Sequence, residues 1–252
     1  MIHPSLIIAR YTLLEALRNR LIWLLVLVVL AAVGVSGFLN ELALTESRQV
    51  QAALLAALLR LAAVFLIATF VVTSMVREAN DKGLELLLAL PLPRSAYLFG
   101  KLGGFAALAL LPALLFGALL LFFTPLAQGA LWAASLLCEL WIVAAFCLLC
   151  ALSLTQVMPA LAAAFGFYLL ARSAGTLQLL GADPHSASQQ AIKAGLDVLA
   201  ALLPKLDAYT RTEWLIYHTG NAQALFDILA QTAVSVALIT AAALFDLYRK
   251  NI

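Results

Sequence analysis

The sequence predicts an all-α membrane protein with six transmembrane helices, and two properties of the chain lead to this fold class. Of its 252 residues, 65% are hydrophobic and 11% are charged, and the mean hydropathy is +1.04. Soluble domains are about half apolar and about a quarter charged. In addition, six apolar runs reach the roughly 20 residues that a helix needs to cross a hydrocarbon core about 30 Å thick. We therefore expect a single transmembrane domain over 1–252.

The first predicted element is a helix over residues 4–19. Its apolar residues recur at helical spacing, its charged residues fall on the other side, and Pro4 suits a first turn. This pattern is typical of an amphipathic helix lying in the plane of the lipid headgroups; a solvated cytoplasmic helix is the alternative. We expect no cleavable signal here, because the apolar run that follows is too long and no small-residue cleavage site comes after it.

The spans follow this helix in order. The first two are joined by a short polar link over 40–51, and Thr124-Pro125 closes the third. A tight turn over 153–159 separates the fourth span from the fifth. The six predicted spans are 20–39, 52–76, 102–124, 131–153, 159–180 and 225–247.

The segment 77–101, between the second and third spans, is the most polar part of the chain. It carries seven of the 28 charged residues. Residues 83–90 are predicted to form a short helix that ends at Pro91, since proline cannot continue a helix. Pro91 and Pro93 then form a stiff turn. The side chains expected to face an aqueous partner are those of Lys82, Glu85 and Arg94. We interpret this charged segment as a surface on which another protein acts.

The stretch 181–224 is the longest one outside the spans. Residues 187–203 present one apolar helical face, and Pro204 ends the pattern. A second, shorter amphipathic piece over 213–217 leads into the last span. We expect these two pieces either to dip into the membrane as re-entrant helices or to lie on it as a cap.

The distribution of lysine and arginine predicts the orientation, because cytoplasmic loops carry an excess of these residues. With six spans both termini share a side. That side holds nine basic residues, namely Arg10, Arg18, Arg20, Arg77, Lys82, Arg94, Lys101, Arg249 and Lys250. The other side holds four, namely Arg48, Lys193, Lys205 and Arg211. Both termini and the charged segment are therefore expected in the cytoplasm, and 181–224 outside it.

Three ionisable residues fall inside predicted spans, where a charge is costly and is paired or functional. Counted from the predicted cytoplasmic ends, Arg60, Glu139 and Arg172 lie at depths of about 24, 21 and 20 Å at 1.5 Å per residue. They are therefore expected to form one charged layer, with Glu139 between the two arginines. The layer either locks helices together, with the arginines free to snorkel outward, or forms an outer gate or a site for an anionic group.

Cys147 and Cys150, with Met158 beyond them, resemble a soft-metal set that would select copper. Cysteine is also a small apolar residue common in buried helices, so we predict no metal site. The sequence has no Gly-x-x-x-x-Gly-Lys-Ser/Thr loop and no His-Glu-x-x-His motif. We therefore expect no P-loop ATP site and no cofactor in this chain.

The order of these elements resembles the permease subunits of ABC-2 type transporters, in the branch that includes copper-processing type permeases. The resemblance covers nearly the whole chain, from an N-terminal elbow helix to an extracytoplasmic helical pair before the last span. Its most specific part is the charged segment, where the family shows an acidic residue, a leucine-rich helix, Pro-x-x-Arg and Gly-Lys. The matching residues are Glu78, Glu85, Leu87, Leu88, Pro91, Arg94, Gly100 and Lys101.

Lys82-Gly83 stands where the family has Gly-Thr, so a helix-capping hydroxyl is lost. The stretch 203–207 also looks like the family's outer Pro-x-Leu-Asp segment.

The resemblance implies a non-catalytic half-transporter, an exporter subunit that pairs as a dimer in the bacterial inner membrane. Each copy would dock an ABC ATPase subunit, which would hold ATP and magnesium. The residues implied in ATPase coupling are Glu78, Lys82, Gly83, Glu85, Pro91, Arg94 and Lys101. Two alternatives remain: a secondary transporter that works alone, and a membrane assembly scaffold without an ATPase partner. Nucleic acid is not an expected partner, because the net charge is only +2.

Overall fold

The computed structural model describes residues 4–19, 21–42, 47–81, 93–180, 193, 195 and 203–249. Every regular element in these residues is helical, which confirms the predicted all-α fold class. Six long helices run along the bundle: α2 (Leu21–Leu42), α3 (Ser47–Asn80), α5 (Arg94–Leu120), α6 (Leu126–Ser153), α7 (Val157–Leu180) and α10 (Ala222–Arg249). Three shorter elements complete it: α1 (Pro4–Arg18), the 3-10 turn η1 (Leu206–Ala208) and α9 (Thr212–Ile216).

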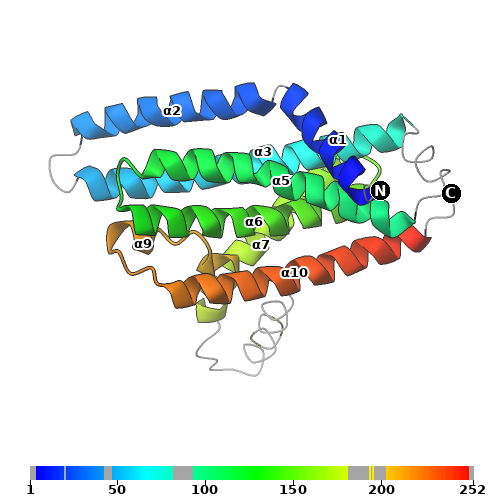
Figure 1. Cartoon of the computed structure of the whole chain (residues 1–252). Helices are drawn as coiled ribbons and strands as arrows, with labels where there is room; N and C mark the ends of the chain where they lie inside the picture. The colour runs from blue at the N-terminus through cyan, green and yellow to red at the C-terminus, as the bar shows by residue number, and fades with distance from the viewer. Residues whose placement is uncertain are drawn as a thin grey trace.

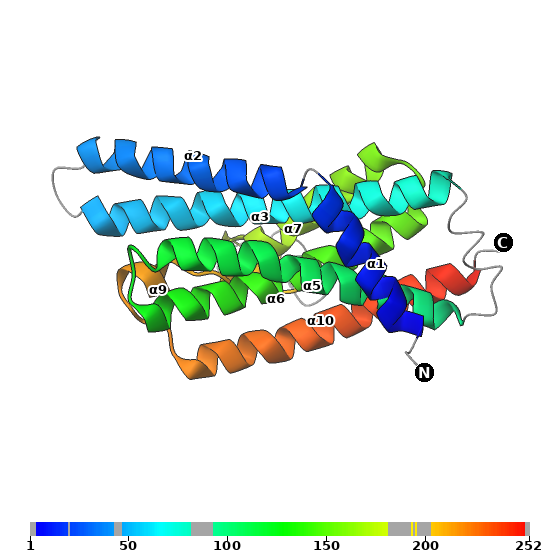
Figure 2. The same ribbon diagram turned by 45° about the horizontal axis from the view of Figure 1, so that its top comes forward.

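The bundle has two distinct ends (Figure 1). The start of α1 and the end of α10 lie together at one of them, which we call the terminal end. The end of α3 and the start of α5 lie there too, so the charged segment connects helices at the terminal end. The opposite end, which we call the loop end, holds α9, and Figure 2 shows the same arrangement from a second direction.

Five helices in the described residues are long and apolar enough to cross a membrane, and they are α3, α5, α6, α7 and α10. A sixth crossing is counted when α1 and α2 are taken as one broken span bent by 55°. The 22 residues of α2 alone extend about 33 Å at 1.5 Å per residue, which matches a hydrocarbon core of about 30 Å. The chain is therefore a membrane-spanning protein with five to six crossings.

The core of the bundle is built around α6. It packs against α3, α5, α7 and α10, and its Trp132, Leu136 and Leu140 are fully buried. The aromatic ring pair of Phe146 on α6 and Phe167 on α7 stacks at 3.8 Å between centroids. Since α6 is enclosed by four helices, a polar side chain on it must find its partners within the protein.

The helix α1 crosses α5 near the terminal end, and two glycines allow the close approach (Figure 2). A Cβ atom at Gly100 would lie 2.7 Å from the Cβ of Ile8, and one at Gly104 would lie 2.7 Å from the Cβ of Thr12. Small residues four apart let two helices pack with their backbones near each other. In consequence α1 is attached to α5 along one face.

The ends of the helices differ from the predicted spans next to the charged segment. We expected spans to end at residue 76 and to begin at residue 102, but α3 continues to Asn80 and α5 begins at Arg94, directly after Pro93. The reason is that Glu78 and Lys101 neutralise each other, so these charged turns remain helical inside the bundle. The predicted helix 83–90 lies outside the described residues, as does most of the predicted helix 187–203.

At the loop end α3, α6 and α10 begin before the predicted spans, whereas α5 ends at Leu120 and not at residue 124, because turns over 121–123 lead into Pro125. The helix α6 begins at Leu126, immediately after Pro125, and not at residue 131, because proline has the extended backbone that precedes a helix start. The short element α9 lies over the predicted amphipathic piece 213–217.

Candidate functional site

A buried ion pair joins the two helices that flank the charged segment. Glu78, near the end of α3, pairs with Lys101, in the third turn of α5. Tyr97, one turn before Lys101, donates its hydroxyl hydrogen to Glu78 Oε1 at 3.1 Å. Lys101 and Tyr97 are only 6% and 2% exposed and the Glu78 side chain is 16% exposed, so the contact is largely closed to water. The pair ties the end of α3 to the start of α5.

The N-terminal helix is connected to the same region. Ser74 on α3 donates its hydroxyl hydrogen to Glu15 Oε1 on α1 at 2.9 Å. Beside this contact is a hollow of about 540 Å³ between α1 and the end of α3, lined by Tyr11, Leu14, Glu15, Arg18, Asn19 and Arg77. At the terminal end, α1, α3 and α5 therefore form one connected unit.

Arg94 opens α5 and contacts the last helix. Its Nη1 donates to the carbonyl oxygen of Leu247 at 2.9 Å and to that of Tyr248 at 3.3 Å. Its guanidinium also lies 5.8 Å from the centroid of the Tyr248 ring, within the range of a cation–π attraction. A cation at the C-terminal end of a helix satisfies carbonyls that have no partner within the helix. Arg94 thus holds α5 against the end of α10.

The structure brings three of the proposed coupling residues to the base of the charged segment, and they are Glu78, Arg94 and Lys101. They face other helices of the bundle: Glu78 and Lys101 face each other, while Arg94, which we expected to meet an aqueous partner, faces α10. The others, Lys82, Gly83, Glu85 and Pro91, lie outside the described residues.

The second polar cluster lies at the centre of the bundle, around Glu139. This side chain is fully buried, and its Oε1 lies 3.6 Å from Arg172 Nη1 on α7. Tyr168 donates its hydroxyl hydrogen to Glu139 Oε1 at 2.9 Å, and Thr210 donates to Oε2 at 2.9 Å. A carboxylate in this position requires such partners, because burying an unpaired charge costs several kcal/mol.

The chain between α7 and α10 enters the bundle at this cluster. The backbone N–H of Thr210 donates to Ser135 Oγ at 2.9 Å, and Arg172 donates to the carbonyl oxygens of Leu206 and Tyr209 at 2.6 and 3.0 Å. Since Glu139 is 13 residues from Leu126, the start of α6, the chain reaches about 20 Å inward from the loop end. Irregular backbone at membrane depth is tolerated where it is buried in protein or lines a water-filled cavity. Here Leu206, Tyr209 and Thr210 are buried, and we call residues 206–210 the inserted segment.

The inserted segment is also held by α10. Tyr209 is fully buried, and its hydroxyl lies 3.2 Å from the carbonyl oxygen of Ile228 and 2.9 Å from Thr232 Oγ1. These contacts tie the inserted segment to α10.

Neither a family model nor a curated protein matches the chain. The two clusters are therefore interpreted from their geometry and from the sequence pattern.

The predicted charged layer is only partly an ion-pair network. Glu139 and Arg172 are paired, whereas Arg60 makes no ion pair with Glu139 among the described residues, and its buried Nε has no hydrogen-bond partner there. Glu139 lies halfway along α6, because that helix begins five residues earlier than predicted. Its contacts with α7 and the inserted segment fit the interpretation of the layer as a lock between helices.

The three cysteine residues all lie on one helix. Cys138, Cys147 and Cys150 are buried and reduced on α6, and Met158 is 79% exposed on α7. Within the described residues, no group of three or more His, Cys, Asp and Glu side chains could hold a metal ion.

Sequence reasoning missed four residues of the central cluster, which are Ser135, Tyr168, Tyr209 and Thr210. Two of them carried a usable signal: Ser135 precedes Glu139 by four residues, and Tyr168 precedes Arg172 by four. Residues four apart lie on the same face of a helix, so each charge had a polar neighbour on its own helix. Tyr209 and Thr210 lie in irregular backbone, where no such periodicity applies.

Proposed function

We propose that the chain is the membrane-spanning permease subunit of an ABC-2 type exporter, located in the bacterial cytoplasmic membrane with both termini in the cytoplasm. Two copies pair, and each docks one ATPase subunit that binds ATP and magnesium. The chain itself is not an enzyme. It transmits the movement of the ATPases to its helices, and the pathway between the copies opens outward.

The observation that carries this proposal is the buried Glu78–Lys101 pair with its Tyr97 bond. These contacts couple α3 to α5 at the two ends of the charged segment. A force on that segment would therefore move both helices together, as a lever requires. An ion pair is not needed here for stability alone, because replacing a buried pair with apolar residues is often neutral or stabilising.

The connection through α1 supports the same mechanism. The Ser74–Glu15 bond and the contacts at Gly100 and Gly104 attach α1 to α3 and α5. A partner that presses on α1 would therefore also move α3 and α5, which are the helices that a force on the charged segment would move. The excess of basic residues at the terminal end supports a cytoplasmic location for this surface.

The test is reconstitution with the partner. The chain is purified from its native membrane in mild detergent, and the copurifying proteins are identified by mass spectrometry. A P-loop ATPase is expected, and its ATP hydrolysis in liposomes should depend on the chain. Reversing two charges of the charged segment that are expected to face an aqueous partner, Lys82→Glu and Glu85→Arg, should uncouple ATP hydrolysis from transport while insertion remains normal. Asp227→Lys, an exposed charge reversal in the second turn of α10 at the loop end, is the matched control.

The two alternative functions, secondary transport and membrane assembly, would give different results in the same experiment. If the purified chain moves solute in liposomes under an ion gradient and without ATP, it is a secondary transporter. If it copurifies with membrane proteins that contain no ATPase and moves nothing, it is an assembly scaffold. Either outcome contradicts the permease proposal, as does unchanged transport in both charge-reversal variants.

A further inference from the structure

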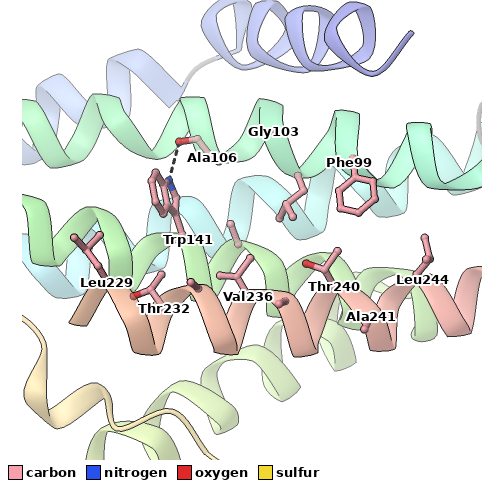
Figure 3. A pocket seen from close by; sticks show the side chains of 14 residues that line it. Phe99, Gly103, Ala106, Trp141, Leu229, Thr232, Val236, Thr240, Ala241 and Leu244 are labelled. Carbon is pink, nitrogen blue, oxygen red and sulfur yellow. Dashed lines mark hydrogen bonds between the residues drawn. The ribbon is translucent and has the colours of Figure 1, made fainter. Parts of the chain in front are cut away.

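An apolar groove runs along the outside of the bundle between α5 and α10, with α6 as its floor (Figure 3). Its volume is about 770 Å³, which is within the range of small-molecule sites. Phe99 and Leu244 lie at the end toward the terminal end of the bundle, and Trp141 and Leu229 lie at the other (Figure 3). From Leu244 to Leu229 the groove follows α10 for about 22 Å at 1.5 Å per residue. Its shape is long, narrow and open to the side.

Specific contacts fix the positions of the helices that form the walls of the groove. At the floor, Trp141 Nε1 donates to the carbonyl oxygen of Ala106 on α5 at 3.2 Å (Figure 3). At the terminal end, Arg94 bonds α5 to the carbonyls of α10. Between these two contacts, Gly103 on α5 and Ala237 on α10 provide little side-chain volume, so the groove stays open.

One polar group in this groove lacks a partner. Thr240 is 8% exposed, and its hydroxyl has no hydrogen-bond partner among the described residues. Thr232, on the same helix, donates to the carbonyl oxygen of Ile228 at 2.7 Å. A buried hydroxyl without a partner is costly, so the contrast with Thr232 indicates that a ligand atom completes the bonding at Thr240.

Two arginines lie beyond the terminal end of the groove, although neither lines it. Arg94 lies at the level of Leu247 and Tyr248, and the guanidinium of Arg249 lies 5.9 Å from the Phe245 ring. The nearby acid on α10, Asp246, faces α6, where Ser153 donates to it at 3.0 Å. Basic sites between helices at a membrane surface bind anionic lipid headgroups. The mouth of the groove therefore suits a phosphate.

We propose that the groove binds one acyl chain of an anionic phospholipid, with the phosphate near Arg94 and Arg249 and the ester carbonyl accepting the hydrogen of Thr240. The Thr240 hydroxyl lies about 10 Å along α10 from Leu247, in the direction in which the acyl chain would extend. In a phospholipid the ester likewise lies between the phosphate and the acyl chain. A helix from a second copy fits less well: a helix about 10 Å wide over this length occupies about 1,700 Å³. The site goes beyond the proposed function and requires no ATPase partner.

Quenching of tryptophan fluorescence by brominated lipid tests the site, because Trp141 lines the groove. The full chain carries Trp23→Phe, since Trp23 is 77% exposed, while Trp132 and Trp214 are buried. It is reconstituted in vesicles of phosphatidylcholine and phosphatidylglycerol, with bromine on the chains of one lipid or the other. Brominated phosphatidylglycerol is expected to quench more than brominated phosphatidylcholine at equal mole fraction. Trp141→Phe should remove that difference.

Variants locate the lipid. Arg249→Gln should abolish the headgroup preference, and Ala237→Phe should reduce quenching by either lipid because it fills the groove. Ala242→Phe, at an exposed position of α10 outside the groove, should change neither. Thr240→Val should weaken relative binding about threefold to tenfold through the lost hydrogen bond. Equal quenching by both lipids in the parent chain, or an unchanged signal in Ala237→Phe and Arg249→Gln, would overturn the proposal.

Discussion

Thr210 Oγ1 donates a hydrogen bond to Glu139 Oε2 at 2.9 Å, across 71 residues of sequence. The donor lies in the inserted segment and the acceptor at the middle of α6. Thr210 has a φ of 46°, which a β-branched residue adopts only at a cost. The bond and the strain occur at the same residue, so this contact has to repay the unfavourable backbone conformation.

The first prediction separates the hydroxyl of Thr210 from its backbone strain. Thr210→Val keeps the shape and the β-branch but removes the donor to Glu139, and we expect a loss of about 1–3 kcal/mol in unfolding free energy. Thr210→Ser keeps the donor and should stay close to the parent. Thermal unfolding in detergent, followed by size-exclusion chromatography, measures the difference. Equal midpoints for the two variants would contradict a role for the bond.

The second prediction concerns which arginine pairs with Glu139. In a double-mutant cycle, Glu139→Ala with Arg172→Ala should be non-additive by about 1–3 kcal/mol, because the two side chains are in contact. The cycle of Glu139→Ala with Arg60→Ala should give a smaller coupling, since Arg60 acts on Glu139 only at longer range. Thermal unfolding of the parent and the five variants supplies the free energies. A coupling with Arg60 as large as that with Arg172 would show that Arg60 is in contact.

The third prediction tests the seating of α1 on α5 with neighbouring glycines. A Cβ atom at Gly104 would lie 2.7 Å from the Thr12 Cβ, whereas at Gly103 it would lie 3.8 Å from the Ala9 Cβ. Gly104→Ala should therefore displace α1 and cost about 1–3 kcal/mol. Gly103→Ala should be neutral or stabilise by up to about 1 kcal/mol. Unfolding midpoints check both, and the reverse ranking would mean that α1 packs elsewhere in the membrane.

The fourth prediction addresses the pair at the terminal end. Glu78→Lys places two cations together in a site that is largely closed to water, and Lys101→Glu places two anions there. Each single variant should lose about 3–5 kcal/mol, as is typical when one partner of a buried pair is removed. The double swap should recover a large part of that loss. Thermal unfolding measures all three, and a double variant as unstable as the sum of the singles would argue against the pair.

Tyr97→Phe tests the third member of the Glu78–Lys101 cluster. It removes one donor to Glu78 and leaves the ion pair in place, so we expect a loss of about 1 kcal/mol. A loss as large as that of Glu78→Lys would mean that the tyrosine, and not the ion pair, holds α3 to α5.

The long helices could be predicted from the sequence because their apolar runs are continuous and about as long as the membrane is thick. Their ends were less predictable. At Glu78 and Lys101 the charges suggested that helices stop, yet each charge removes the cost of burying the other. A pairing across the charged segment has no signature in either helix alone.

The central cluster was half predictable for a related reason. Glu139 and Arg172 were matched by their depth in adjacent spans, which depends only on helical rise. Arg60 has a similar predicted depth, but depth does not give the direction in which a side chain points. Thr210 comes from irregular backbone whose path depends on the folded bundle, so no pattern in the sequence predicts its contact with Glu139.

The position of Glu139 has a consequence for the making of the protein. Among the described residues, the side chains that bond its carboxylate come later in the chain, at Tyr168, Arg172 and Thr210. During synthesis, α6 must therefore enter the membrane with a carboxyl group whose partners do not yet exist. A nascent chain at that stage depends on water, on a proton or on the insertion machinery to shield the group. Chains that end before residue 210 should be recognised by membrane quality control as unfinished.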